Sequence, residues 1–401
     1  MERKQVTVAE LEFGMYVAEL DRPWTETPFM FQGFHLRTDQ QLAALKKFCK
    51  HVFIDLERTE QRNEQPDSSP SPQFKIRGET AYPEKASVEV EFKQAAQVYE
   101  QSAGSLLDLL KPVAKQGGVL EAKEIKESVS RLTDSVTRNP DAMLLVTRLR
   151  EKSAEAHARA LQVSIYLIVF GRYLQLTREE LELLGLLGLL QDVGKTRLPA
   201  DLMERKGPLS VEETELAKRH VEFSAEILAH TPGLPPKLPE LALLHHERQD
   251  GTGYPRGLKG VEIGLYGSMA AIADAFDALT AVRPYAEPLS PSSALSYLYK
   301  ERGTGFHAEL VEQFIQCVGV FPVGSVVELN SGEVGIVITQ NLVRRLKPRV
   351  MVVLDPQGNP VRPHKILDLE KEPKAGPDEP YRIRRSMESS KVEVDPRELF
   401  L

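Results

Sequence analysis

Two adjacent histidines, His245 and His246, end an apolar helical run and are followed by Glu247 and a glycine-rich turn. Neighbouring side chains on a helix diverge by about 100°, so both imidazoles serve one site only if that site holds more than one acceptor. A pair of metal ions is such a site. The alternative is a solvated histidine pair at a helix C-terminus, where cationic side chains are favoured. The pair alone does not decide between the two interpretations.

Other side chains that can ligate metals lie in the same region. His157 and His220 fall within predicted helices, and Asp192 follows a leucine-rich helix. Asp274 lies inside the apolar run 269–275, where a buried carboxylate is costly unless it is paired or ligated. Mixed histidine and carboxylate ligands suit Fe, Mn or Zn better than Ca or Mg. A carboxylate such as Asp192 can bridge two metals, which would activate a water for attack on phosphorus.

The order of these residues resembles the HD-GYP domain, the branch of the HD phosphohydrolase superfamily that hydrolyses cyclic di-GMP in bacteria. The resemblance covers about residues 140–320 and is carried by His157, Asp192-x-Gly194-Lys195, His220, His245-His246-Glu247, Asp250-Gly251-x-Gly253-Tyr254-Pro255, Asp274-x-x-Asp277-Ala278 and Arg283-Pro284-Tyr285. It implies a helical domain that binds two or three metal ions. It also implies cleavage of cyclic di-GMP to linear pGpG and, in many members, onward to GMP.

The resemblance assigns roles to individual residues. The positions that match the family's metal ligands hold His157, Gln191, Asp192, His220, His245, His246 and Asp274. Lys195 would stabilise the phosphate or the metal-bound oxygen, so that Asp192 and Lys195 are the expected catalytic residues. Two divalent ions are expected as cofactors, with Fe or Mn favoured and Zn as an alternative.

The resemblance also predicts the contacts with substrate and partners. Gly253, Tyr254 and Pro255 would shape the substrate pocket, and their loop would help to dock partner proteins such as GGDEF-type cyclases. Asp277 and Arg283 would lie near the nucleotide, since the planar donors of an arginine suit a phosphate or a guanine edge.

Three positions depart from the family pattern. The family is named after a His-Asp pair, and Gln191 stands here at the His position; a neutral amide oxygen binds Fe or Mn more weakly than imidazole does. Ser153 replaces the Glu of members with three metals, which argues against a third ion. Ala286 replaces a basic residue that often follows Arg-Pro-Tyr, which removes one phosphate contact.

Gln191 leaves more than one functional interpretation open. We favour a working cyclic di-GMP phosphodiesterase, because the other ligand positions, the lysine and the whole loop remain. The alternative is a catalytically weak or inactive module that binds cyclic di-GMP or a partner protein. Hydrolysis of another phosphomonoester or nucleotide is a third reading, since HD domains as a class perform it.

The predicted fold is mainly α, with an all-helical HD-type domain between two smaller units. The Thr177–Glu180 and Ser210–Glu213 capping boxes each begin a helix of this domain. The expected organisation is a small α+β domain over 1–60, a linker over 61–84, connecting helices over 85–138, the HD-GYP helical phosphodiesterase domain over 139–321, a β appendage over 322–370 and an extended or partly disordered tail over 371–401.

Composition limits the class of protein. The chain of 401 residues has material for two or three domains, and its formal net charge of −7 argues against a DNA-binding surface over the whole molecule. Cys49 and Cys317 lie outside any CxxC pattern, which indicates a reducing, cytoplasmic setting. Membrane spans need about 18 apolar residues, more than any run here provides. The helices over 85–138 leave a homodimer open.

Overall fold

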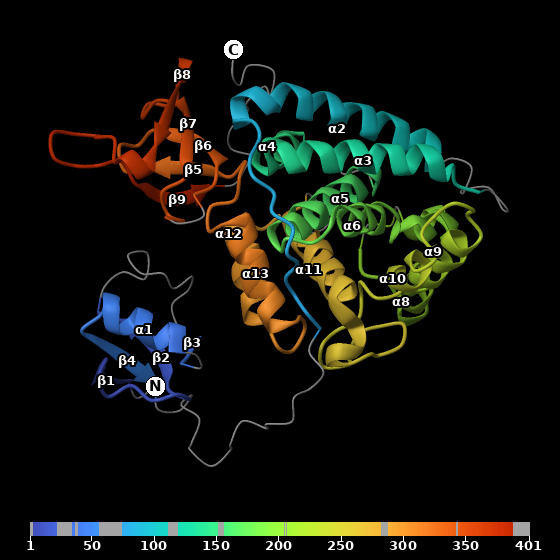
Figure 1. Ribbon diagram of the computed structural model, residues 1–401, viewed down its shortest axis with the longest axis horizontal. Helices are drawn as coiled ribbons and strands as arrows, with labels where there is room; N and C mark the ends of the chain where they lie inside the picture. Colours follow the sequence, from blue (N-terminus) through green and yellow to red (C-terminus); the bar gives the residue numbers. More distant parts are fainter. Residues whose placement is uncertain are drawn as a thin grey trace. The chain divides into compact units, whose positions relative to one another are not determined.

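The computed structural model describes residues 3–21, 34–36, 39–55, 74–110, 119–150, 156–203, 205, 207–281, 288–341 and 344–387. The chain forms two compact units, Met1–Gln73 and Phe74–Leu401 (Figure 1). Among the described residues, no helix is both long enough and apolar enough to cross a membrane.

The first unit is a small α+β domain, as its sequence predicts. Its antiparallel sheet has the order β1-β4-β2-β3, formed by β1 (Arg3–Thr7), β2 (Tyr16–Leu20), β3 (Phe34–His35) and β4 (His51–Asp55). One helix, α1 (Asp39–Phe48), accompanies the sheet. Val17, Leu45 and Val52 are fully buried in one core, because alternate strand residues and one stripe of the helix are apolar. The predicted cap of this helix, Thr38, lies outside the described residues.

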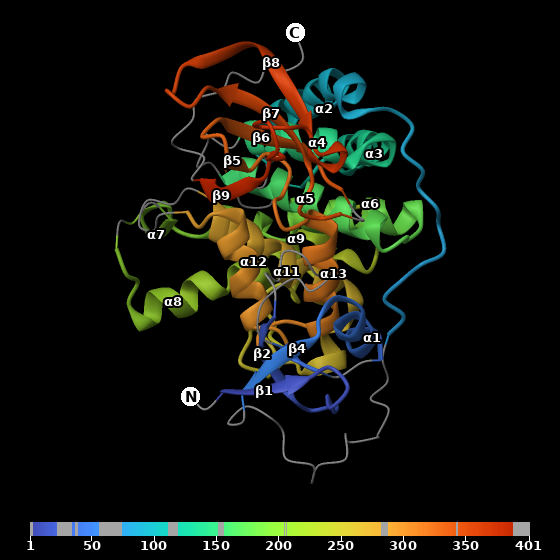
Figure 2. The same cartoon turned by 90° about the vertical axis from the view of Figure 1, so that its left-hand side faces the viewer.

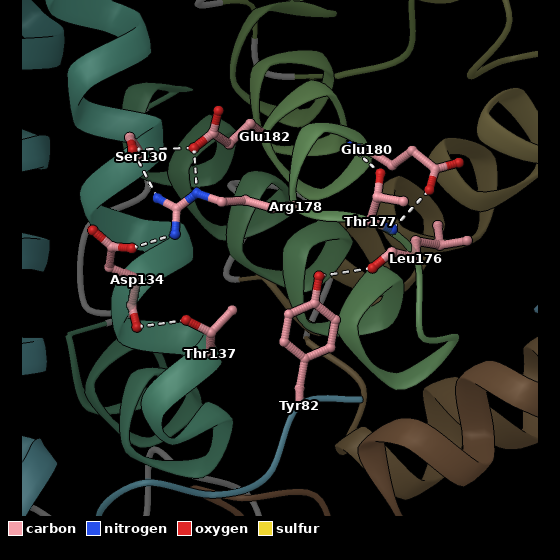
Figure 3. A network of polar contacts seen from close by, with 9 residues as sticks. All are labelled: Tyr82, Ser130, Asp134, Thr137, Leu176, Thr177, Arg178, Glu180 and Glu182. Carbon is pink, nitrogen blue, oxygen red and sulfur yellow. Dashed lines mark hydrogen bonds and ion pairs between the residues drawn. The ribbon is translucent and has the colours of Figure 1, made fainter. Parts of the chain in front are cut away.

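The second unit begins with an extended segment that is bonded to the helical domain. The Gly78 and Thr80 amides donate to the carbonyl oxygens of Leu174 and Gln175 at 2.8 and 3.0 Å. The Tyr82 hydroxyl donates to the next carbonyl oxygen, that of Leu176, at 2.7 Å (Figure 3). The linker predicted over 61–84 therefore falls partly outside the described residues, and from residue 74 onward it follows the surface of the helices.

Helices are the main regular structure of the second unit. The first five are α2 (Val88–Leu110), α3 (Ala122–Arg138), α4 (Pro140–Leu149), α5 (Ala156–Tyr173) and α6 (Arg178–Leu190). The others are α7 (Ala200–Met203), α8 (Val211–Lys218), α9 (His220–Ala229), α10 (Leu238–Ala242), α11 (Gly264–Thr280), α12 (Pro291–Lys300) and α13 (Ala308–Val318), with 3-10 turns η2 (Val193–Arg197) and η3 (Gly260–Ile263). Helices α5 and α6 lie side by side between α2–α4 and the group of α9, α10 and α11 (Figure 1, Figure 2).

Sequence-encoded caps and polar contacts fix α6 within this arrangement. Thr177 and Glu180 form the predicted capping box at its start, and Ser210 forms the second predicted box at the start of α8. Arg178 then ties α6 to α3, because its guanidinium binds Asp134 at 2.6 Å and the Ser130 hydroxyl at 3.1 Å (Figure 3). These contacts fix the start of α6, and Gln191 and Asp192 follow its other end.

A five-stranded antiparallel sheet follows the helices, in the order β8-β7-β6-β5-β9. Its strands are β5 (Val326–Leu329), β6 (Val334–Thr339), β7 (Arg349–Leu354), β8 (Pro360–Asp368) and β9 (Ile383–Met387), and a 3-10 turn, η4 (Leu369–Lys371), follows β8. The sheet contacts α4, where the Asp141 carboxylate accepts the Gln340 amide proton at 2.9 Å (Figure 2).

The sheet corrects one expectation. The tail predicted over 371–401 contains β9, which pairs with β5, while residues 388–401 lie outside the described part. The segment Ile383–Met387 is charged and lacks the apolar alternation of a strand. Without it, β5 would be an edge strand with unpaired backbone groups. Arg384 and Arg385 add ion pairs to the Glu328 carboxylate of β5. Pairing with β5 and these ion pairs therefore stabilise β9, rather than an apolar pattern of its own.

Candidate metal centre

Four of the predicted ligands meet at one place in the helical domain. Single ligand atoms of Asp192, His220, His245 and His246 all lie within 4.8 Å of one another. Asp192 follows α6, His220 is the first residue of α9, and the two adjacent histidines follow α10. Side chains from three segments, separated in sequence by up to 54 positions, thus converge. This donor set of one carboxylate and three imidazoles suits a transition-metal ion.

Gly194 allows the Asp192 turn to reach α9. A Cβ atom at Gly194 would lie 2.1 Å from the His220 carbonyl oxygen and 2.4 Å from the Ser224 backbone nitrogen. The Gly194 amide also donates to the Ser224 hydroxyl at 2.8 Å. Because η2 and α9 touch through their backbones, Asp192 Oδ1 comes within 3.1 Å of His220 Nε2. The glycine in the Asp-x-Gly-Lys motif is therefore a requirement of packing.

Backbone carbonyl groups orient two of the imidazoles. His220 Nδ1 lies 2.7 Å from the Ala217 carbonyl oxygen, and His245 Nδ1 lies 2.8 Å from that of Ala242. A carbonyl oxygen only accepts, so each Nδ1 carries the proton and, in a neutral ring, each Nε2 presents its lone pair. Such second contacts are typical of histidines that ligate metals.

The atoms that face one another at the centre have no hydrogen bond among the described residues. Asp192 Oδ1, His220 Nε2 and His245 Nε2 are buried, and although the two nitrogens lie 3.1 and 3.5 Å from the oxygen, their alignment is not that of hydrogen bonds. Buried polar atoms without partners are costly. Three converging lone-pair donors fit a cation between them, so the residues present fit the metal that the sequence predicts.

Electrostatics keeps two of these groups in their metal-binding forms. Burial raises the pKa of Asp192, but the Lys195 ammonium, 2.6 Å from its Oδ2, is the largest of the influences that hold this pKa well below its usual range. Burial and the nearby His245 hold the pKa of His246 far below its usual range. The carboxylate is thus charged and this imidazole neutral at pH 7.

The loop after the histidines forms a wall beside the centre. The Tyr254 ring stacks on the His246 ring, with centroids 4.7 Å apart, and the Tyr254 amide donates to the His246 carbonyl oxygen at 3.2 Å. Burial raises the pKa of Tyr254, and the charges of Asp192 and Asp274 raise it further. Its hydroxyl therefore stays protonated and can donate a hydrogen bond.

The Glu247 side chain holds this loop in place by hydrogen bonds to its backbone. Its side chain is buried, and its two oxygens accept the backbone amides of Arg256 and Leu258 at 2.8 and 3.0 Å. At Gly253 the loop passes so close that a Cβ atom would lie 2.4 Å from the Arg248 nitrogen. The carboxylate of the His-His-Glu segment thus binds backbone amides, which explains why this position needs a residue with two acceptors.

Two predicted site residues on α11 differ in their surroundings. Asp274 is buried but lies outside the four-residue cluster. Its charge, like that of Asp192, raises the pKa of Tyr254, so Asp274 faces the same region. Asp277, predicted to lie near the nucleotide, is fully buried, and its Oδ2 accepts a hydrogen bond from Arg159 Nε at 2.9 Å. Burial raises the pKa of Asp277 to about 6, although Arg159 opposes this.

Arg159 was not among the residues predicted from the sequence. The available signal was Asp277 itself, because a carboxylate in an apolar helix requires a cationic or hydrogen-bonding partner. Which of the chain's 51 lysines and arginines is that partner depends on how α5 packs on α11, since Arg159 is 118 positions away in sequence.

Gln191 is the last residue before Asp192 and caps the end of α6. Its side chain is buried, and neither its amide oxygen nor its amide nitrogen has a hydrogen-bond partner in the described part of the chain. His157 lies in the first turn of α5, but its side chain is outside the described residues, as are Ser153, Arg283 and Ala286.

Comparisons with known proteins assign families to three regions. Residues 143–310 match the HD domain family, residues 3–125 match a domain of unknown function (DUF3391), and residues 326–375 match the KOW domain associated with HD domain. The match over residues 143–310 confirms the resemblance of the helical region to the HD superfamily.

Individual relatives extend this match over most of the chain. It is similar to the cyclic di-GMP phosphodiesterase PA4108 of Pseudomonas aeruginosa, with 29% identity over 369 residues that cover 91% of this chain and 89% of the relative. It is also similar to the cyclic di-GMP phosphodiesterase response regulator RpfG of Xanthomonas campestris pv. campestris, with 31% identity over 53% of this chain and 62% of the relative. Among solved structures, Bd1817 of Bdellovibrio bacteriovorus, titled an HDG"Y"P protein, superimposes with a TM-score of 0.47 at 14% identity, over 78% of this chain and 98% of that one.

Proposed function

We propose that this chain, whose residues 143–310 match the HD domain family, is a metal-dependent phosphodiesterase that hydrolyses cyclic di-GMP to linear pGpG. The observation that carries the proposal is the cluster of Asp192, His220, His245 and His246, with its buried lone-pair donors facing one another. The names of the relatives that match most of the chain agree with this activity. Further hydrolysis to GMP stays a prediction.

The ligand set extends beyond the cluster in this proposal. Asp192, His220, His245 and His246 would hold two divalent ions, iron or manganese, and His157, Gln191 and Asp274 would complete the coordination. When bound, the ions would supply Lewis-acid activation of a water and would neutralise phosphate charge.

The chain's own residues bind and orient the substrate. Lys195 keeps the Asp192 carboxylate charged, and its ammonium, about a quarter exposed, can also donate to a phosphate oxygen. The protonated Tyr254 hydroxyl offers a neutral donor, and the loop that Glu247 anchors covers one side of the centre. Partner binding through the Gly253, Tyr254 and Pro255 loop, and a homodimer, stay predictions.

The alternative of an inactive module is not favoured. That alternative depends mainly on Gln191, whereas the carboxylate, the three imidazoles and the lysine lie together. An amide oxygen is a weaker ligand than an imidazole, but it is still a ligand for hard and borderline ions. We therefore expect the substitution to lower metal affinity rather than to abolish catalysis.

The test measures metal and turnover together. We expect protein purified without oxygen to contain iron or manganese and to convert cyclic di-GMP to pGpG, followed by chromatography of the products. Full metal occupancy without turnover would contradict the proposal.

A variant of the cluster tests the site assignment. His245→Ala should lower metal affinity and turnover by at least about a hundredfold, because losing even a group that only orients a ligand costs 10- to 100-fold. His230→Ala is the control, since His230 is exposed at the end of α9. Unchanged turnover in His245→Ala would refute the assignment.

A further inference from the structure

The buried ion pair between Arg159 and Asp277 lies near the metal centre, and the proposed reaction does not use it. Arg159 of α5 donates from Nε to Asp277 Oδ2 of α11 at 2.9 Å. The Asp277 carboxylate is only 1% exposed, whereas the Arg159 side chain is 27% exposed. The carboxylate is therefore sealed inside the helices, while part of the arginine reaches solvent.

The charges of three carboxylates act on this arginine. Asp277 contacts it directly, and Asp274 lies one helical turn before Asp277 on the same face of α11. Burial lowers the pKa of Arg159, but the charges of Asp277, Asp274 and Asp192 outweigh burial and raise this pKa. Asp192 belongs to the metal cluster, so the positive charge of Arg159 acts at the centre itself.

The guanidinium still has donors to offer. Nε is used for Asp277, and among the described residues the two Nη groups have no hydrogen-bond partner. A guanidinium whose Nε is fixed presents its two Nη groups in a rigid plane, a geometry that matches two oxygens of one phosphate. Fixing the plane in advance also reduces the entropy lost when an anion binds.

We propose that Arg159 binds the phosphate of the phosphodiester substrate and that Asp277 is a positioning residue that holds Arg159 in place. This inference rests on the proposed function and adds a second cation to Lys195. It replaces the predicted contact of Asp277 with the nucleotide, because a sealed carboxylate beside an arginine acts through that arginine.

The chain contains a matched control pair. Arg138 donates from Nε to Glu91 at 2.8 Å, and the two side chains are 27% and 2% exposed. This pair joins α3 to α2, and neither residue belongs to the metal cluster. Arg138 also donates from one Nη to the other Glu91 oxygen at 2.8 Å, so this pair has the same burial but one more hydrogen bond. Arg138→Met therefore removes a pair that is at least as strong, and measures what such a loss does to folding alone.

The experiment separates binding from turnover. In metal-loaded full-length protein, Arg159→Met should raise the KM for cyclic di-GMP by about ten- to a hundredfold, the range expected for a hydrogen bond between charged groups. It should weaken the binding of inorganic phosphate, measured by calorimetry, by a similar factor. Asp277→Asn should raise KM less, and Arg138→Met should change neither quantity.

Each outcome is decisive. An unchanged KM and an unchanged phosphate affinity in Arg159→Met would overturn the inference, as would wild-type protein that binds no phosphate. If wild type binds phosphate through Arg159 but does not turn over cyclic di-GMP, the proposed function fails and this inference stands. If Arg159→Met does not fold, Arg159→Gln answers the same question, because its amide can still donate to Asp277 but carries no charge.

Discussion

The packing of η2 against α9 predicts that Gly194→Ala weakens the metal centre although no ligand residue is replaced. The new Cβ atom would lie 2.1 Å from the His220 carbonyl oxygen, 2.4 Å from the Ser224 nitrogen and 2.8 Å from the Phe223 Cβ. Two of these neighbours are backbone atoms, so no rotamer change relieves the contacts. The turn has to move away from α9 by about 1 Å, which is typical of overpacking that costs about 1–3 kcal/mol.

The same displacement separates two ligands. Asp192 lies two residues before Gly194, and its Oδ1 is 3.1 Å from His220 Nε2. A shift of about 1 Å is large for coordination, in which distances hold within about 0.2 Å. We therefore expect the affinity for Mn²⁺ to fall by about 10- to 100-fold, as when groups that orient ligands are removed.

Calorimetric titration with Mn²⁺ and thermal unfolding measure the two effects. The control is Gly104→Ala in α2, where a Cβ atom would meet nothing within 4 Å, so that alanine should stabilise the helix by up to about 1 kcal/mol. Gly194→Ala protein that binds Mn²⁺ as tightly as wild type would show that the turn and α9 do not set the distance between Asp192 and His220.

Two further predictions concern the loop and the sheet. Glu247→Gln keeps one acceptor but turns an NH₂ group toward a backbone amide, which should cost about 1–3 kcal/mol and speed hydrogen exchange of the loop amides; unchanged exchange would contradict this. Burial raises the pKa of Asp141 to about 7, above its usual 3.8, so its stabilising effect is present at low pH and is lost as pH rises through about 7. Asp141→Asn, which can still accept the Gln340 amide, should therefore gain about 2 kcal/mol over wild type between pH 5 and pH 8 in denaturant unfolding; equal gains at both pH values would disprove it.

Local signals predicted the helical architecture well. The capping boxes at Thr177 and Ser210 need only residues three positions apart, and both form as expected. Strand β9 could not be predicted in this way, because its residues lack apolar alternation and pair through the edge of β5. A strand that depends on its partner leaves little trace in its own sequence.

The candidate site shows the same difference between features visible in the local sequence and features set by tertiary packing. Histidines and aspartates at ligand spacing were visible in the sequence, and the structure brings four of them within 4.8 Å. The supporting contacts were not visible. Glu247 binds amides of residues 256 and 258 only once the loop has closed, and Asp277 meets Arg159 only because α5 packs on α11. Residue types reveal candidate ligands, whereas tertiary packing decides what orients them.

The same reasoning bears on Gln191, one of the positions that depart from the HD-GYP pattern. An amide that served only to fill space would lose hydrogen bonds to water on burial and would need protein partners in return. Among the described residues it has none for either polar atom, although it lies beside Asp192 and is 1% exposed. Asp192 Oδ1, His220 Nε2 and His245 Nε2 also have no hydrogen-bond partner there, and one bound cation would satisfy those three lone pairs together. We therefore propose that the Gln191 oxygen adds a further ligand beside Asp192, and that its weaker donation lowers metal affinity.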